Sequence, residues 1–222
     1  MTSRTYDQFC GVARALDLVG ERWALLVVRD LILGPKRFTD LRRGLPGIGT
    51  NILAARLKEL ERGGVVARRT LPPPAASVVY ELTEYGRALE EPLLALGRWG
   101  ATSMGPRQDG QALRSEWLAV ALKAFFRPEA AADLRADIEL RFEDGTFLVR
   151  IDRSSLLVEP SARNGADLVL TTEVETLIGY LAGADVPAAA LEPDGDEALL
   201  ERLPRIFAFG LRNEDPRAVD SA

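Results

Sequence analysis

Apolar positions in the first half of the chain recur with the period of amphipathic helices, and then with the alternation of strands. Residues 45–49 contain two glycines and a proline, which predict a tight turn between two of the helices. Thr50 supplies an N-cap for the helix after this turn, and Gly63-Gly64 ends that helix. The predicted helices cover 10–19, 21–33, 37–44, 50–62 and 84–99, and the predicted strands, which pair as a hairpin, cover 65–71 and 77–82.

The second half of the chain has a different pattern, in which a helix precedes a hairpin and further strands. The polar segment 105–110, rich in helix breakers, separates the two halves. Helices are predicted over 111–126, 173–182 and 197–209, and strands over 137–142, 146–152, 156–159 and 167–171. The fold class is therefore α+β, with one domain over 1–105 and a second, small α/β-layered domain over 106–222.

The chain contains one cysteine, Cys10, and no histidine. This composition excludes an intramolecular disulfide, histidine-dependent catalysis and metal sites built from several Cys or His ligands. The acidic pairs Glu143-Asp144 and Asp194/Asp196 fall in predicted turns, where carboxylates usually cap and solvate the backbone. We therefore expect a protein that is not an enzyme, with no catalytic residue, no metal site and no cofactor.

No segment predicts membrane insertion or secretion. The longest unbroken apolar run, 23–28, is far shorter than the stretch of about 20 residues that crosses a bilayer. Residues 1–11 lack the apolar core of a secretory signal. We expect a cytoplasmic protein that has no membrane partner.

The net charge of −5 conceals an asymmetry between the two halves. Residues 1–105 hold 15 Lys or Arg against 11 Asp or Glu, whereas residues 106–222 hold 13 against 22. Within 36–69 there are nine basic residues and three acidic ones. A basic segment inside an acidic chain indicates a polyanionic partner, although a solvated charged face is the simpler alternative.

The order helix, turn, helix and hairpin over 37–69 is that of a winged helix-turn-helix, whose second helix enters the DNA major groove. In the helix 50–62, one face carries leucines at 53, 57 and 60. The predicted contacts to double-stranded DNA lie on the opposite face, on the wing and at the start of the first helix: Lys36, Arg37, Thr50, Asn51, Ala54, Ala55, Lys58, Arg62, Arg68 and Arg69.

Each of these residue types suits one kind of DNA contact. The Asn51 amide can address an adenine edge, whereas Lys58 and Arg62 can address phosphate or guanine. Arg56 lies near the buried face, where an ion pair within the protein is expected. A helix-turn-helix with surface cations can also be a packing module, so this pattern alone leaves both interpretations open.

The chain resembles the HxlR-type winged helix-turn-helix regulators of bacteria. The resemblance rests on Cys10, the segments ALDLVG (15–20) and RW (22–23), GPKRFTDLRRGLPGIGTNILAARLKELERGGVVARR (34–69) and VVYELTEYGRAL (78–89). It implies a homodimer that binds a pseudo-palindromic operator and dimerises through the N-terminal helix and the helix 84–99. The apolar stripe of Leu89, Leu93, Leu96 and Trp99 fits a dimer contact, and packing on the second domain is the alternative.

In several members of the resembled family, a cysteine at the place of Cys10 senses oxidants or electrophiles. Cys10 begins a predicted helix, where the dipole lowers a thiol pKa. A switch would need a disulfide to Cys10 of a second copy, a small thiol or alkylation, because the chain has no other cysteine. The alternative is a small, buried packing residue.

The second half is more loosely similar to sterol-carrier-protein-type domains, in which a small sheet is covered by helices around an apolar tunnel. The similarity rests on 166–172, 175–183 and 195–207, with a shortened strand at 191–194. The candidate lining of a site for an apolar effector is Phe125, Phe126, Leu177, Tyr180, Leu181, Ile206 and Phe209. An ordinary core is the alternative for these residues, and a lipid-like carrier with a vestigial DNA-binding domain is the alternative for the protein.

Overall fold

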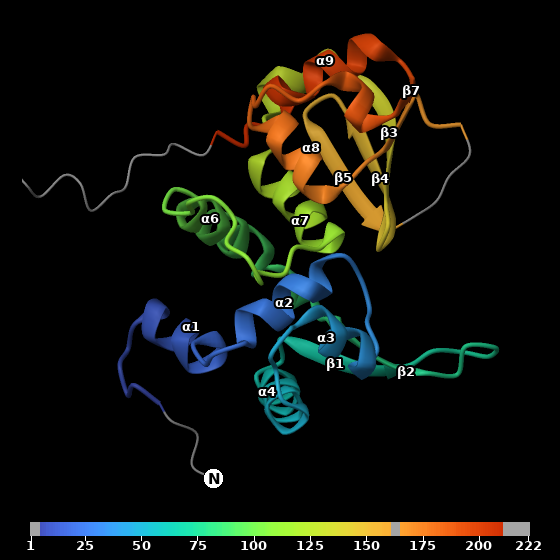
Figure 1. Cartoon of the computed structure of the whole chain (residues 1–222). Helices are drawn as coiled ribbons and strands as arrows, with labels where there is room; N and C mark the ends of the chain where they lie inside the picture. The colour runs from blue at the N-terminus through green and yellow to red at the C-terminus, as the bar shows by residue number, and fades with distance from the viewer. Residues whose placement is uncertain (1–4, 161–164, 211–222) are drawn as a thin grey trace, which may run out of the picture. The chain divides into compact units, whose positions relative to one another are not determined.

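Helices dominate the first part of the chain and a five-stranded sheet the second (Figure 1). The computed structural model describes residues 5–160 and 165–210. Two compact units are present, of which unit 1 extends to Leu93 and unit 2 begins at Leu94. The division into functional domains after residue 105 stays a prediction. The mixed α+β class, with a helix-turn-helix and wing in the first unit, is confirmed.

Unit 1 is a winged helix-turn-helix. Its elements are α1 (Gly11–Val19), α2 (Ala24–Ile32), α3 (Phe38–Gly44), α4 (Thr50–Arg62), β1 (Val66–Thr70), β2 (Val78–Leu82), α5 (Glu84–Arg87) and the start of α6 (Glu90–Ala101). β1 and β2 pair antiparallel, with Val66 opposite Leu82. Lys36 adds a bridge to this hairpin, because its backbone N–H and C=O bond those of Tyr80 at 2.9 and 2.8 Å. The sequence pattern did not predict this bridge.

Leucine and valine side chains from several elements form the core of unit 1. The residues that are at most 3% exposed include Val27, Val28, Leu31, Leu41, Leu53, Leu57, Leu60, Val65 and Leu82. Three of them belong to α4, so this helix is held by one apolar face and its other side is left to solvent. Burial of this kind, rather than helix propensity, supplies most of the stability of a short helix.

Two helix starts differ from the sequence-based prediction. The second helix begins at Ala24, because Trp23 adopts a left-handed conformation with φ 79° and closes a turn over 21–23. Thr50 is the first residue of α4 and is not its N-cap; that place belongs to Gly49. The Thr50 hydroxyl instead accepts a hydrogen bond from the Arg42 guanidinium at 3.3 Å.

The single helix expected over 84–99 is divided into α5 and α6 by a turn at 88–89. Pro92 explains the division, because a proline ring in a continuous helix would clash with the carbonyl of Ala88, four residues earlier. Leu89 and Leu93 then pack against the core of unit 1. Half of the apolar stripe that the sequence assigned to a dimer contact is therefore used inside the subunit.

Unit 2 is a five-stranded sheet with helices on one face. Its remaining elements are α7 (Ser115–Phe125), η1 (Pro128–Ala131), β3 (Arg135–Phe142), β4 (Gly145–Asp152), β5 (Ser155–Pro160), β6 (Leu168–Thr171), α8 (Val174–Leu181), η2 (Ala188–Leu191), β7 (Pro193–Gly195) and α9 (Glu197–Ile206). The strand order is β5-β4-β3-β6-β7, in which β3 and β6 are parallel and the other neighbours antiparallel. Figure 1 shows α7, α8 and α9 together beside this sheet.

The predicted helices and strands of unit 2 are present, with shorter ends for two helices. The first begins at Ser115, whose N–H donates to the Asp144 carboxylate at 3.4 Å, and not at residue 111. The last ends at Ile206, because Phe207 is extended and bridges Phe126. Among the described residues, no helix is long and apolar enough to cross a bilayer.

Candidate nucleic-acid interface

The second helix of the helix-turn-helix, α4, has two faces of opposite character. Leu53, Leu57 and Leu60 are at most 1% exposed and hold the helix on the core. The opposite side is solvent-exposed and carries the residues that we call the outer face of α4: Asn51, Ala55, Lys58 and Arg62. Ala54 is also exposed, at the margin of this face. The face is thus narrow, polar and free of bulky groups at its centre.

The polar side chains of the outer face have no partner inside the described part of the chain. No side-chain hydrogen bond or ion pair joins Asn51, Lys58 or Arg62 to another described residue. Arg56, on the flank, behaves differently and pairs with Glu59 at 2.7 Å and with Glu21 at 3.4 Å. The prediction of an internal ion pair for Arg56 is confirmed, and the outer cations remain available to a ligand.

The N-terminal end of α4 adds backbone donors to this surface. Gly49 caps the helix without a side-chain hydrogen bond, and no acidic residue lies in the first turn. Thr50 is exposed at this end. The unpaired N–H groups and the positive end of the helix dipole favour an anion here.

Further cations surround α3, the first helix of the motif. Arg37 is exposed at its start, where its N–H donates to Asp40 at 3.3 Å, while Lys36 is half-buried beside β2. Arg42 and Arg43 are also exposed and were not among the predicted DNA contacts. Helical periodicity could have predicted their exposure. When Leu41 faces the core, the next two positions of the helix face away from it.

The two arginines of the wing differ in their engagement. Arg68 is exposed and forms no ion pair with a described residue. Arg69 makes two hydrogen bonds of 2.9 Å to the Glu81 carboxylate on the neighbouring strand. These bonds lower the pKa of the Glu81 carboxyl from its ordinary value. Arg68 can therefore bind a phosphate without first breaking an ion pair, whereas Arg69 cannot.

Removing the charge of Glu81 should release Arg69 for an external anion. We expect Glu81→Gln to raise affinity for duplex DNA about two- to five-fold at low salt, the range of one surface ion pair. Fluorescence anisotropy with a labelled duplex measures this change. The matched control is Glu84→Gln, an exposed acid outside the ion pair; an equal gain from both variants would mean that only net charge matters.

Cys10 lies immediately before α1 and is solvent-exposed. The nearby backbone N–H groups of Ala13 and Val12 lower the pKa of its thiol. The interpretation of Cys10 as a buried packing residue is therefore wrong for the subunit. An exposed thiol of lowered pKa is accessible to oxidants and alkylating agents.

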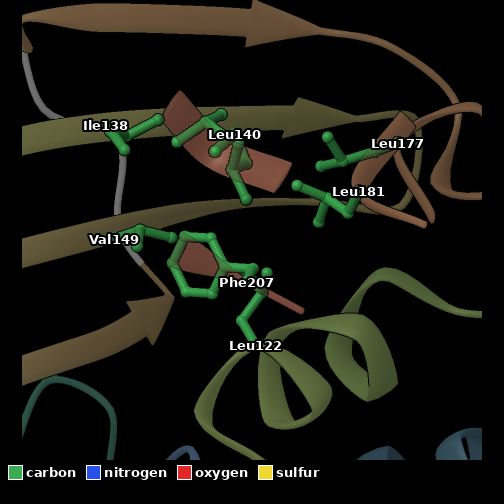
Figure 2. Close-up of a pocket in the computed structure, with 8 residues that line it drawn as sticks. Leu122, Ile138, Leu140, Val149, Leu177, Leu181 and Phe207 are labelled. Carbon is green, nitrogen blue, oxygen red and sulfur yellow. The ribbon is translucent and has the colours of Figure 1, made fainter. Parts of the chain in front are cut away.

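Unit 2 contains a small apolar cavity of about 10 Å³, which is roughly the space of one water molecule. Its lining comes from β3, β4, α7, α8, α9 and the residue after α9: Leu122, Ile138, Leu140, Val149, Leu177, Leu181, Leu203 and Phe207. Figure 2 shows Leu122, Leu177, Leu181 and Phe207 around the strand residues Ile138, Leu140 and Val149. Leu177 and Leu181 are thus the only predicted effector contacts that line it. The β3 and β4 contributions were missed, because the sequence does not show which strands lie under which helix.

The other five candidate effector residues belong to the packed interior or to its edges. Ile206 is fully buried, and the Tyr180 hydroxyl donates to the Leu200 carbonyl at 3.0 Å. Each of the three candidate phenylalanines packs on another aromatic ring at a tilt, with ring-centre distances of 4.8 Å for Phe125–Phe209 and 5.9 Å for Phe126–Phe207. These contacts are those of an ordinary core.

The comparison with known proteins identifies the first half of the chain. Residues 18–108 match the profile of the HxlR-like helix-turn-helix family. The uncharacterized HTH-type transcriptional regulator YvaP of Bacillus subtilis (strain 168) is 36% identical over 93 residues, which are 42% of this chain and 86% of YvaP. The chain belongs to the HxlR-like helix-turn-helix family. The family match ends at residue 108, so most of unit 2 lies outside it.

Two further regulators give similar identities. The HTH-type transcriptional regulator YodB of the same organism is 41% identical over 85 residues, which are 38% of this chain and 76% of YodB. The solved structure of the redox regulator HypR in its oxidized form is 36% identical and covers 44% of this chain and 100% of its own, with a TM-score of 0.41. Both Bacillus subtilis relatives carry the name of an HTH-type transcriptional regulator.

Proposed function

We propose that this protein is a bacterial transcription regulator that binds double-stranded DNA with α4 in the major groove. The observation that carries the proposal is the outer face of α4, exposed and cationic on a helix whose other face is fixed in the core. A single α-helix fits the major groove, and the second helix of such motifs reads base edges there. Membership of the HxlR-like family supports the same function.

The contacts follow from the chemistry of each side chain. Asn51 offers a donor and an acceptor to an adenine edge, whereas Lys58 and Arg62 bond phosphate or guanine. Ala54 and Ala55 allow the helix backbone to approach the bases closely. The remaining predicted positions, Lys36, Arg37, Thr50, Arg68 and Arg69, surround this helix and would contact the phosphate backbone or, from the wing, the minor groove. A protein that binds chromosomal DNA works in the bacterial cytoplasm, the location that the sequence predicts.

The regulator is proposed to act as a homodimer on a pseudo-palindromic operator. The supporting observation in unit 1 is a row of exposed apolar side chains, in which Phe9 is fully exposed and Val12 and Leu16 are 70% and 44% exposed. In unit 2, Leu96 and Trp99 are exposed on α6. Apolar surfaces of this kind mark protein contacts, and a second copy would cover them.

Control of the regulator through Cys10 is supported by the exposure of the thiol and by its lowered pKa. Oxidation would join Cys10 to the same residue of a second copy or to a small thiol, and an electrophile would alkylate it. Each product changes the surface beside the exposed row of α1. The DNA-binding geometry of a dimer built on that surface would change with it.

Control by an apolar effector in a sterol-carrier-like unit 2 is the second regulatory proposal. Its support is the sheet with helices on one face and an entirely apolar cavity between them. The cavity has room for about one water molecule, so an effector would have to separate the helices from the sheet. An effector regulates only if it binds two states of the dimer unequally. The alternative of a lipid-like carrier needs a much larger cavity, which makes it the weaker proposal.

The proposal is tested with the purified full chain and duplex DNA from the region upstream of its own gene. We expect a complex with retarded electrophoretic mobility at low salt and an affinity that falls steeply as the salt concentration rises. The reason is that lysine and arginine side chains of the bound protein release counterions from the DNA. Absence of any complex at low salt, in reduced protein without added effector, would overturn the proposed function.

Asn51→Ala should relax sequence preference more than it weakens binding. Loss of one bidentate amide contact to adenine costs about 1–3 kcal/mol on the preferred sequence and little on others. Selection of bound sequences from random DNA measures the preference at each position of the half-site. Loss of preference at a single position in each half-site supports this role for Asn51, whereas a uniform loss of affinity across all sequences contradicts it.

A further inference from the structure

Ile52 is a large apolar side chain left in solvent on an otherwise polar surface. It is the third residue of α4 and is 48% exposed. It belongs neither to the buried core of unit 1 nor to the partly buried apolar residues packed on that core. It is the only large apolar side chain of α4 among the exposed residues of the described chain. The sequence pattern did not predict a role for this residue.

The position of Ile52 on α4 brings it beside two residues of the outer face. Residues three and four apart are neighbours on a helix surface, so Ile52 and Asn51 both adjoin Ala55. A β-carbon placed on Gly49 would lie 3.9 Å from Cγ1 of Ile52, so the side chain leans toward the N-terminal end of the helix. That end of the second helix contacts the bases in helix-turn-helix proteins. Asn51, Ile52 and Ala55 therefore form one continuous patch, which is polar at one side and apolar at the other.

The major groove displays one apolar group, the C5-methyl of thymine. An isoleucine has no donor or acceptor, so a methyl group is the one feature of a base edge that it recognises favourably. Ala55 leaves space for this approach, because its side chain is a single methyl group. We infer that Ile52 selects thymine in the operator by contact with the C5-methyl, next to the base that Asn51 reads. This inference rests on the proposed function and adds to it a residue that determines specificity.

Deoxyuridine provides the test, because it pairs like thymidine and lacks only the C5-methyl. Duplexes of a selected operator carry deoxyuridine at one symmetric pair of thymine positions at a time, and anisotropy measures the affinity of the full-length protein for each. We expect one pair of positions at which the substitution weakens binding by roughly four-fold per half-site, the factor for one buried methyl group. At the other thymine positions the affinity should stay unchanged.

The variant Ile52→Ala identifies the side chain that senses this methyl group. It should bind the thymine and deoxyuridine duplexes equally, whereas Ile52→Val should retain part of the difference. Leu157→Ala is the matched control, because Leu157 is 42% exposed in unit 2 and far from α4 in the sequence. It should leave the difference intact.

Two results would overturn the inference, and they are distinguishable from each other. If wild-type protein binds every deoxyuridine duplex as tightly as the thymine operator, no methyl group is read and the role of Ile52 is rejected. If Ile52→Ala keeps the methyl preference of the wild type, another residue reads it. Failure of the wild type to bind any duplex would instead overturn the proposed function, and the assignment of Ile52 with it.

Discussion

Replacing both Lys58 and Arg62 by glutamate should lower affinity for the operator by at least about 30-fold, since each reversed contact costs about 1–3 kcal/mol. Both side chains are exposed on α4 and have no ion-pair partner in the described part of the chain. The reversed charges would face phosphates from within the groove, where repulsion is strong. The slope of log affinity against log salt should also become shallower, because fewer counterions are released. Anisotropy titrations at several salt concentrations measure both quantities.

The matched control for this double variant is Arg127→Glu with Arg205→Glu in unit 2. Both arginines are exposed, and the change in net charge is the same. We expect the control to weaken binding only slightly and to keep the salt slope. Equal losses in the two double variants would show that overall charge, and not the outer face of α4, controls DNA binding.

Leu57→Ala should destabilise unit 1 by about 2–5 kcal/mol, the range for removing a leucine from a packed core. Leu57 is 1% exposed and lies between Leu53 and Leu60 in the face that holds α4 on the core. Loss of this anchor should also weaken operator binding, since the helix must be fixed before it can enter the groove. Urea unfolding, monitored through hydrogen exchange of the α4 amides, measures the stability of unit 1 separately from that of unit 2.

Lys58→Ala on the same helix is the control for stability. Because Lys58 is exposed, its removal should change the free energy of unfolding by less than about 0.5 kcal/mol while weakening DNA binding. The two variants therefore separate the roles of the two faces. A Leu57→Ala protein as stable as the wild type would contradict the packing of α4 described here.

Local patterns were enough to predict most of unit 1. The spacing of Leu53, Leu57 and Leu60 predicts both the helix and its buried face, because burial depends on periodicity when one side packs on a core. The glycines and proline of 45–49 predict the turn through local backbone preference. In the structure, Gly47 has a φ of 86°, which other residues rarely adopt. The outer face of α4 followed from the same periodicity.

Features that depend on contacts between distant residues could not be predicted. The Arg69–Glu81 pair requires the register of β1 and β2, which no residue spacing shows. The Lys36–Tyr80 bridge likewise joins segments far apart in the chain. The exposure of Ile52 depends on what the rest of unit 1 leaves uncovered, so a flank position could have been interior or surface.

Unit 2 shows the same division between local and distant information. Its strands and helices appear where their patterns predict them, yet the cavity combines β3 and β4 with three helical segments. Phe125 and Phe209 are aromatic residues on predicted helices, which made them reasonable candidates for a pocket. Their rings instead pack on each other, 4.8 Å apart. Aromatic residues that line a pocket and those that fill a core have the same helical spacing.

The most direct test of the account replaces the N7 atoms of purines, which are exposed in the major groove alone, by carbon. Duplexes of the selected operator carry 7-deazaadenine and 7-deazaguanine either in both half-sites or only in the spacer between them. If α4 reads the major groove, the half-site replacements lower affinity at least about ten-fold, the factor for a lost base contact, and the spacer replacements leave it unchanged. Full affinity for the duplex with replaced half-sites would contradict major-groove recognition by this helix.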